Sequence, residues 1–467
     1  MIDQDLAQET INLALSRGAE FVELFAEDKR GMAAGFDDGK VEELSSGRDR
    51  GVGVRAIRGE TTGYAYTSEF SKQALFKAAE AASSIAIDSQ ESKSLSVDLH
   101  WQSKADPRVP GGSIMWPESV AKADKVRLLE LANKSARAQG GDIAQVSCGY
   151  ADSRRKILVA NSNGLWATDD QVRTRFMVSC VAVGDTGMQM GFEVAASTRG
   201  FEHFEEVDVE ELARLAAERA IRKLSAKPAP TGPMPVVIKG GSGGILFHEA
   251  CGHGLEADHI VKGTSVYANR IGELVASDLV TLVDDGTVSG EWGTYSIDDE
   301  GKPACRNVLI ENGLLVDYMW DGCRASRQGR DSSGNGRRQS YQHLPMVRMT
   351  NTYILGGTSK AEDIISDTDH GIYVAKLGGG QVDTATGDFV FGMVEAYLIE
   401  DGQITTPLRD ANLIGNGPEI LKKVDCIADD FATTPGTCGK DGQQVPVGCG
   451  QPTLRISEIT IGGTSNG

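Results

Sequence analysis

The sequence predicts an α+β protein of two domains: an N-terminal mixed α/β domain, and a C-terminal domain rich in antiparallel strands that carries a metal-binding helix. The first observation is the stretch SAKPAPTGPMP, which holds four of the chain's fourteen prolines. Proline fixes φ and removes a hydrogen-bond donor, so we expect an extended linker there. We therefore divide the chain into residues 1–225, a linker at 226–235, and residues 236–467. The second observation is that strand-like runs do not alternate regularly with helical ones, which argues against a doubly wound parallel sheet.

The N-terminal half mixes helical and strand periodicity. Its strand-like runs, EFVELFAE and RGVGVRAI, lie between segments with apolar residues three and four apart. The dipeptides Asp38-Gly39 and Asn163-Gly164 are typical of tight β-hairpins. Helices are expected at residues 5–17, 71–86, 120–138 and 208–226.

The C-terminal half is richer in strands. Asp285-Gly286, Asn312-Gly313 and Asp401-Gly402 each lie next to apolar runs, a pattern that favours antiparallel hairpins. This half is therefore expected to be built mainly from antiparallel strands.

Composition restricts the partners and the compartment. The formal charge is -19, from 66 acidic and 47 basic residues, which disfavours nucleic acid and anionic membranes as partners. The N-terminal residues do not resemble a signal peptide, and no apolar run approaches the roughly 18 residues of a membrane span. The eight cysteines are scattered without a C-x-x-C pair, so free thiols or metal ligands are expected rather than disulfides. We expect a cytoplasmic protein.

The stretch GGILFHEACGHGLEAD at 243–258 holds His248-Glu249 and then His253. Two histidines five residues apart lie about 140° apart on a regular α-helix, so they could not share one ion. A π-bulge would add one residue to the turn and bring both rings to one face. Gly252 and Gly254 make such a turn easy to form.

Two other interpretations of this stretch are open. On a regular helix Glu249, His253 and Glu256 would share a face and could themselves hold a metal. The stretch could also be a solvated helix face without a ligand. Its apolar, glycine-rich composition instead indicates burial, and buried ionisable groups need partners.

Several segments together resemble one protein family. HEACGHGLEAD followed by GTSVYA is similar to the HExxxH segment of the TldD/PmbA (TldE) metalloprotease family, and specifically to its TldD type. Residues 333–354, 378–405 and 436–456 resemble a long loop with its following strand, a pair of strands, and the C-terminal signature of that family.

The resemblance implies a zinc peptidase that cuts unstructured peptides. Such proteins often act with a TldE-like partner that lacks the metal motif, and some relatives form homodimers. Carried onto this chain, the Zn²⁺ ligands are His248, His253 and Cys438, and Glu249 is the catalytic base. Nitrogen and thiolate ligands suit zinc, and a catalytic zinc site keeps one position for water.

Other candidate ligands rank below this set. Cys449 has a similar glycine-rich setting and is second to Cys438. Cys251 is expected to be a small core residue, and Glu256 to support a ligand by hydrogen bonding. His259 and His343 are expected to make structural or polar contacts.

A loop at residues 323–341 concentrates positive charge in an acidic protein. Either its arginines pair with nearby carboxylates, or the loop lies beside the substrate and holds a peptide's carboxylate or carbonyl groups. Its SSGNG core is expected to be mobile. The arginines are Arg324, Arg327, Arg330, Arg337 and Arg338.

Two further functions compete with the zinc peptidase. One is a non-catalytic peptide-binding subunit of such a complex, and the other is a metal-dependent hydrolase of a different amide. The complete set of His248, Glu249, His253 and Cys438 argues against a pure binding subunit, whereas nothing in the sequence separates the peptidase from the other hydrolase.

Overall fold

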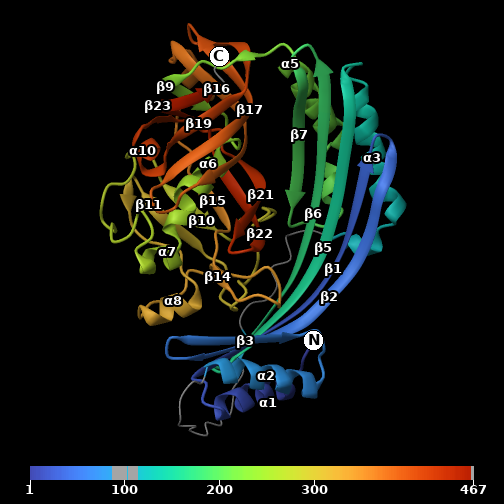
Figure 1. The fold of residues 1–467 in the computed structure, drawn as a ribbon, viewed down its shortest axis with the longest axis vertical. Coiled ribbons are helices and arrows are strands. Elements are labelled where there is room, and N and C mark those ends of the chain that lie inside the picture. Colours follow the sequence, from blue (N-terminus) through green and yellow to red (C-terminus); the bar gives the residue numbers. More distant parts are fainter. Residues whose placement is uncertain (87–101, 104–113, 464–467) are drawn as a thin grey trace.

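A long, curved sheet forms most of the N-terminal half of the protein (Figure 1). The computed structural model describes residues 1–86, 102–103 and 114–463. The strand order is β3-β2-β1-β5-β6, and both β4 and β7 pair with β6. The strands are β1 Phe21–Asp37, β2 Lys40–Arg58, β3 Thr61–Thr67, β4 Gln102–Ser103, β5 Ile143–Asn161, β6 Leu165–Gly184 and β7 Gly187–Ser197.

Helices cover this sheet at two places. In Figure 1, α1 and α2 lie at one end of the sheet, and α3 and α5 cover its outer face. Apolar residues of each helix pair enter a separate buried core with the strands, so each pair stabilises its own part of the sheet. The helical segments are α1 Gln4–Ser16, α2 Lys72–Ala86, the 3-10 turn Pro117–Ser119, α3 Lys122–Arg137, α4 His203–Glu206 and α5 Val209–Lys223.

Two sheets and the helical segment between them form the C-terminal half. The larger sheet runs β16-β9-β23-β19-β17-β18-β8, and pairing of β16 with β17 closes part of it into a ring. Its strands are β8 Lys227–Pro228, β9 Gly232–Ile238, β16 His370–Val382, β17 Asp388–Glu400, β18 Gln403–Arg409, β19 Ala411–Asn416, β20 Val424–Ile427 and β23 Leu454–Gly463.

The second C-terminal sheet has the order β12-β11-β10-β15-β22-β21. Its strands are β10 Leu282–Asp285, β11 Arg306–Glu311, β12 Leu314–Leu315, β15 Asn351–Ile354, β21 Ala432–Lys440 and β22 Gln443–Gln451; β13 Gly336–Arg337 and β14 Met346–Val347 pair separately. The helices of this half are α6 Gly244–Phe247, α7 Ala257–Lys262, α8 Gly322–Arg327, α9 Ala361–Ser366 and α10 Gly417–Lys422.

The expected α+β class and all four N-terminal helices are confirmed, and most strand pairs of the C-terminal half are antiparallel. Hairpins form at Asp38-Gly39, Asn163-Gly164, Asn312-Gly313 and Asp401-Gly402. The hairpin expected at Asp285-Gly286 is wrong, because residues 286–305 form a long excursion before β11 pairs with β10.

The proline-rich segment at 226–235 is part of the C-terminal sheet. Strand β8 pairs with β18, and β9 begins at Gly232 and pairs with β23 and β16. The two-domain boundaries stay a prediction. In the described part of the chain, no helix combines the length and apolar composition needed to cross a bilayer.

Buried ion pairs connect the long sheet to the C-terminal half. Arg338 donates from Nη2 to Oε1 of Glu23 at 2.6 Å, and its guanidinium lies 4.3 Å from the ring centroid of Phe25. Arg55 donates to Glu23 and to Glu300, both at 2.7 Å. Each buried charge therefore has a partner on the other half of the molecule, and each partner depends on the relative placement of the two halves.

Replacing Arg338 with methionine should lower the free energy of unfolding by about 3–5 kcal/mol, because it leaves a buried carboxylate without one of its partners. The control is Arg48→Met, which breaks a more exposed pair with Asp28 and should cost at most about 1 kcal/mol. Urea unfolding followed by tryptophan fluorescence measures both. Equal losses in the two variants would show that the buried Arg338–Glu23 pair contributes no more than a surface pair.

Candidate metal centre

A single π-helical turn carries the two histidines of the HExxxH segment. The backbone N–H of His253 donates to the carbonyl of His248, five residues earlier, so the turn from His248 to Gly252 is one residue wider than an α-helical turn. The imidazole rings consequently lie 5.3 Å apart, centroid to centroid, and nearly perpendicular. The wide turn that the five-residue spacing requires is present.

Packing in the C-terminal core explains the glycines of this segment. A Cβ on Gly252 would lie 2.1 Å from Sδ of Met349, and one on Gly254 would lie 2.8 Å from the ring of Tyr267. These glycines therefore permit close approach of neighbouring side chains. Leu246, Phe247, Ala250, Cys251 and Leu255 enter the main core on the other sides of the segment.

Cys438 comes to the histidines from the distant strand β21. Its Sγ lies 3.3 Å from Nε2 of His253. One ligand atom from each of His248, His253 and Cys438 lies within 4.8 Å of the other two, and all three residues are buried. A turn and a strand far apart in sequence thus bring together two nitrogen donors and one sulfur donor.

The residues present fit a bound metal. His248 is 1% exposed, and neither of its ring nitrogens has a hydrogen-bond partner among the described residues. A buried nitrogen without a partner is unfavourable, and coordination to a cation would satisfy it. The two imidazoles and the thiol are donors of the type that zinc prefers.

Electrostatics favour the thiolate form of Cys438. Burial would raise the pKa of this thiol, but attraction to His248 and to His253, which it contacts, lowers it to about 4. For His253 the burial of the ring would lower the pKa. Attraction to Glu256 and contacts with Cys438 are stronger than this effect and raise the pKa to about 10. Without a metal, protons on the rings offset the thiolate charge, so a divalent cation would take the place of those protons.

Glu256 and Lys440 fix the orientation of the His253 ring from its Nδ1 side. Oε2 of Glu256 accepts from Nδ1 of His253 at 2.8 Å and from Nζ of Lys440 at 2.9 Å. Because a carboxylate only accepts, Nδ1 carries the proton and Nε2 faces Cys438. The ammonium of Lys440 also pairs with Asp258. Glu256, Asp258 and His259 form a second cluster of possible metal ligands, and Lys440 lies between its two carboxylates.

Glu249 lies on the open side of the group. Its side chain is 24% exposed, whereas those of His253 and Glu256 are 8% and 0% exposed. Its Oε2 lies 3.6 Å from Nε2 of His253. Glu249 is thus the carboxylate of this site that water and a substrate can reach.

Cys251, Cys449 and His343 lie outside the group of three candidate metal ligands. Cys251 is fully buried in the core, as expected, and burial raises its pKa to about 12. Cys449 shares a small buried cluster with Cys438 and raises the pKa of His248, but it is not among the three residues whose ligand atoms lie within 4.8 Å of one another. His343 contacts Ser340 at 2.9 Å.

The arginine-rich loop is largely fixed by the fold. Arg324, Arg327 and Arg330 pair with Asp321, Glu60 and Asp317 respectively. The SSGNG core, expected to be mobile, is held in place because Asn335 is fully buried and donates to Asp284 and to the Arg348 carbonyl. Pairing with carboxylates therefore accounts for most of the arginines of the loop, and Arg337 is the exception.

Sequence reasoning missed Lys440 and the hairpin that presents it. Asp441 and Gly442 both have positive φ, 48° and 75°, and join β21 to β22. The Asp-Gly dipeptide between two runs of strand-forming residues is the signal that could have located this hairpin.

Comparison with known proteins defines the class of the molecule. Profiles described as PmbA/TldA metallopeptidase domain 1, central domain and C-terminal domain match residues 22–86, 116–224 and 231–463. These profiles cover most of the chain, and all three describe metallopeptidase domains.

Individual relatives agree with these profiles. The "Metalloprotease TldD homolog" of Haemophilus influenzae is 41% identical over 96% of this chain and 94% of its own length. A "Metalloprotease" of Methanothermobacter thermautotrophicus is 36% identical over 95% of this chain and 96% of its own length. The chain belongs to the PmbA/TldD family of metallopeptidases.

A solved structure shares the fold. The crystal structure of TldE from Thermococcus kodakarensis matches with a TM-score of 0.79 at 22% identity, over 98% of this chain and 100% of that one. The arrangement of a long sheet beside a strand-rich half is therefore common to the two proteins.

Substituting Gly417 with alanine should disturb the wide turn directly. Its Cβ would lie 2.1 Å from the carbonyl oxygen of Ala250, a backbone atom inside the turn. We expect a loss of about 1–3 kcal/mol in the free energy of unfolding, together with weaker zinc binding in a competition titration. Gly439→Ala is the control, since no atom lies within 4 Å of its added Cβ; identical zinc affinity in both variants would contradict the expected dependence on the turn.

Glu256→Gln should weaken zinc binding roughly 10–100-fold, because an amide is a poorer acceptor for the Nδ1 proton of His253. The matched control is Glu273→Gln, which removes an exposed carboxylate paired with Arg270. Competition with a chromogenic chelator gives both dissociation constants. Unchanged zinc affinity in Glu256→Gln would mean that His253 is oriented by the backbone alone.

Proposed function

We propose that this protein is a zinc-dependent peptidase of the HExxxH type that hydrolyses unstructured peptides. The observation that carries the proposal is the convergence of His248, His253 and Cys438 beside the partly exposed carboxylate of Glu249. Two imidazoles and one thiolate would supply three protein ligands, the number that a catalytic zinc site uses. Membership of a metallopeptidase family supports the same reaction class.

The roles of the residues follow from their positions. His248, His253 and Cys438 would hold the ion, which when bound lowers the pKa of a water molecule and polarises a carbonyl oxygen. Glu249 would accept a proton at a carboxylate oxygen as a water oxygen adds to the peptide carbonyl carbon, and would pass this proton to the nitrogen that leaves as the amine when the C–N bond breaks. Glu256 and Lys440 keep Nε2 of His253 directed into the site.

The position of Cys438 suggests how an extended peptide is accommodated. Strand β21 ends the second C-terminal sheet, and among the described strands it pairs only with β22. A peptide that added to such an edge would be held by main-chain hydrogen bonds, which do not depend on its sequence. This arrangement favours unfolded segments over folded proteins.

We further propose that the active form is a dimer, with a TldE-like chain or with a second copy, in the cytoplasm. The support is the similarity to TldD-named relatives and the shared fold with a TldE structure. The competing function is a peptide-binding subunit without catalytic activity.

The metal content of purified protein is the first test. The wild type should hold about one zinc per chain, and His253→Ala and Cys438→Ala should lose it. Cys449→Ala, a neighbouring buried cysteine outside the ligand group, should keep it. Zinc retained in Cys438→Ala but lost in Cys449→Ala would assign the third ligand to Cys449.

Peptide digestion on the same preparations tests the reaction. Glu249→Gln should retain zinc and lose about 10²–10⁴-fold in cleavage rate, because the proton acceptor is gone. Assays with and without a TldE-like chain separate the two dimeric forms. Full zinc loading with no cleavage in either assay would favour the peptide-binding subunit.

A further inference from the structure

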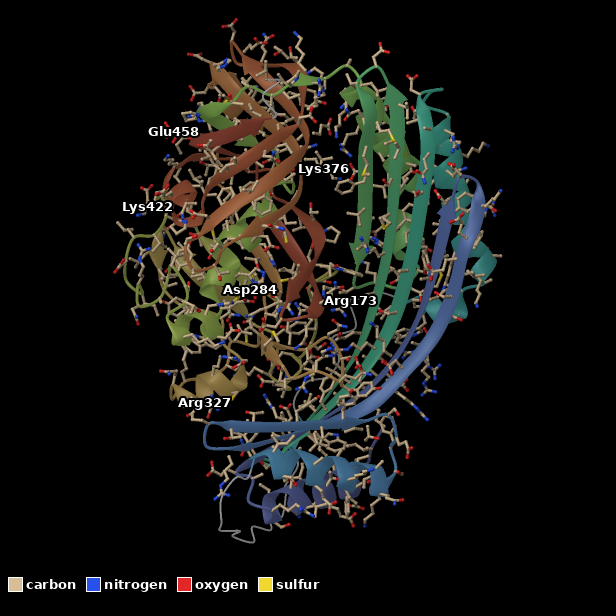
Figure 2. All side chains as sticks on the ribbon, in the orientation of Figure 1. Arg173, Asp284, Arg327, Lys376, Lys422 and Glu458 are labelled. Atoms are coloured by element: carbon tan, nitrogen blue, oxygen red, sulfur yellow. The ribbon has the colours of Figure 1, made fainter. Side chains whose placement is uncertain are left out.

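A cavity of about 310 Å³ lies between the long sheet and the C-terminal half, on the other side of β21 from the metal centre. Thr437 lines this cavity, whereas the adjacent Cys438 faces His253, since successive side chains of a strand point to opposite faces. Figure 2 labels Arg173 beside the gap between the two halves. The cavity is therefore separate from the candidate metal centre but shares a strand with it.

The sheet contributes three cations to one face at this place. Lys29 lies directly opposite Arg155 in the β1–β5 pair, and Ser153 lies opposite Arg173 in the β5–β6 pair. Because strand side chains alternate, Lys29, Arg155 and Arg173 point to the same side, and all three line the cavity. Arg337 lines it from the C-terminal half.

Two of these guanidinium groups have no carboxylate partner among the residues that the structure describes. Arg173 is 8% exposed and donates to the carbonyls of Trp292 and Thr294 and to the side-chain oxygen of Gln171. Arg337 is 4% exposed and donates to the carbonyls of Met349 and Pro446. Within the ranges that the structure describes, neither forms an ion pair, although the chain carries 66 acidic residues.

The acidic groups of the cavity are already engaged. Asp299 accepts from Arg155 and from the backbone N–H of Arg338, and Asp298 accepts from three backbone N–H groups. Arg155 still has one buried terminal nitrogen, Nη2, without a partner among the described residues. Burial, and then the repulsion of Arg337 and Arg155, lowers the pKa of Arg173 to about 9, the direction expected where positive charge is in excess.

We propose that this cavity binds an oxyanion, a carboxylate or a phosphate group, between Arg173 of the sheet and Arg337 of the C-terminal half. Guanidinium groups bind both kinds of oxyanion through paired N–H donors. A bound anion would supply the missing negative charge and would join the sheet to Arg337, which itself donates to the Pro446 carbonyl of the hairpin that carries Cys438. The oxyanion can come from a free small anion or from an acidic side chain of a peptide, and neither source requires that the protein cleave peptides.

Isothermal titration calorimetry at low salt on the full-length Glu249→Gln protein tests the proposal without turnover. The probes are inorganic phosphate, succinate, and two end-blocked hexapeptides that differ only by glutamate against glutamine. Arg173→Gln should weaken the binding of the recognised probe at least tenfold, and Lys29→Gln several-fold, because each removes one cation. The matched control is Arg175→Gln, a half-buried arginine on the same face of β6 that does not line the cavity.

Each result has a defined meaning. Binding of phosphate or succinate that depends on Arg173 and Lys29, but not on Arg175, supports a site for a free anion. Binding of the glutamate peptide alone, with the same dependence, supports an acidic segment of a peptide as the source. The absence of binding by every probe, or equal binding by all variants, overturns the proposal; if Arg173→Gln does not fold, the more exposed Lys29→Gln decides.

Discussion

The candidate metal centre depends on one hydrogen bond, from the backbone N–H of His253 to the carbonyl of His248. With a regular α-helical turn the two rings would point about 140° apart and share no ligand. The wider turn gives up the regular α-helical hydrogen-bond pattern, so packing of the surrounding core must stabilise the turn. Met349 and Tyr267 pack so closely against Gly252 and Gly254 that a Cβ at either position would clash, and Gly417 in turn packs directly against the Ala250 carbonyl.

Buried charges are stabilised in different ways beside the histidines and at the boundary between the two halves. Beside the histidines, the buried carboxylate of Glu256 has local partners in His253 and Lys440. At the boundary between the two halves, Arg55 and Arg338 are paired with Glu23, whereas the partners of Arg173 and Arg337 among the described residues are uncharged carbonyl and amide oxygens. An acidic protein that leaves these two without carboxylates retains a local positive field. We infer that the ion pairs stabilise the contact between the two halves, and that the guanidinium groups of Arg173 and Arg337 bind the anion proposed above.

Local patterns in the sequence predicted much of the fold, because those patterns act over short distances. The four N-terminal helices and four of five Asp-Gly or Asn-Gly hairpins appear where periodicity and turn chemistry place them. Asp285-Gly286 failed because the same dipeptide also suits the start of a longer loop, and only tertiary pairing of β10 with β11 distinguishes the two. The spacing of His248 and His253 required a wide turn, but it did not identify the third ligand. Cys438 came from a family resemblance, since a contact across 185 positions leaves no periodic signal.

The register of the β21–β22 hairpin is the second determinant of the site. Cys438 and Lys440 are two residues apart on one strand, so they point to the same face: one towards Nε2 of His253 and the other towards the carboxylate that holds Nδ1. A slip of one residue would turn both away together. The turn at Asp441 and Gly442, with both φ values positive, fixes the register immediately beside Lys440. One short turn therefore sets the ligand and its electrostatic support at the same time, while Thr437 and Gln444 of the same hairpin face the cationic cavity. The hairpin is the structural element through which an event in that cavity could reach the candidate metal centre.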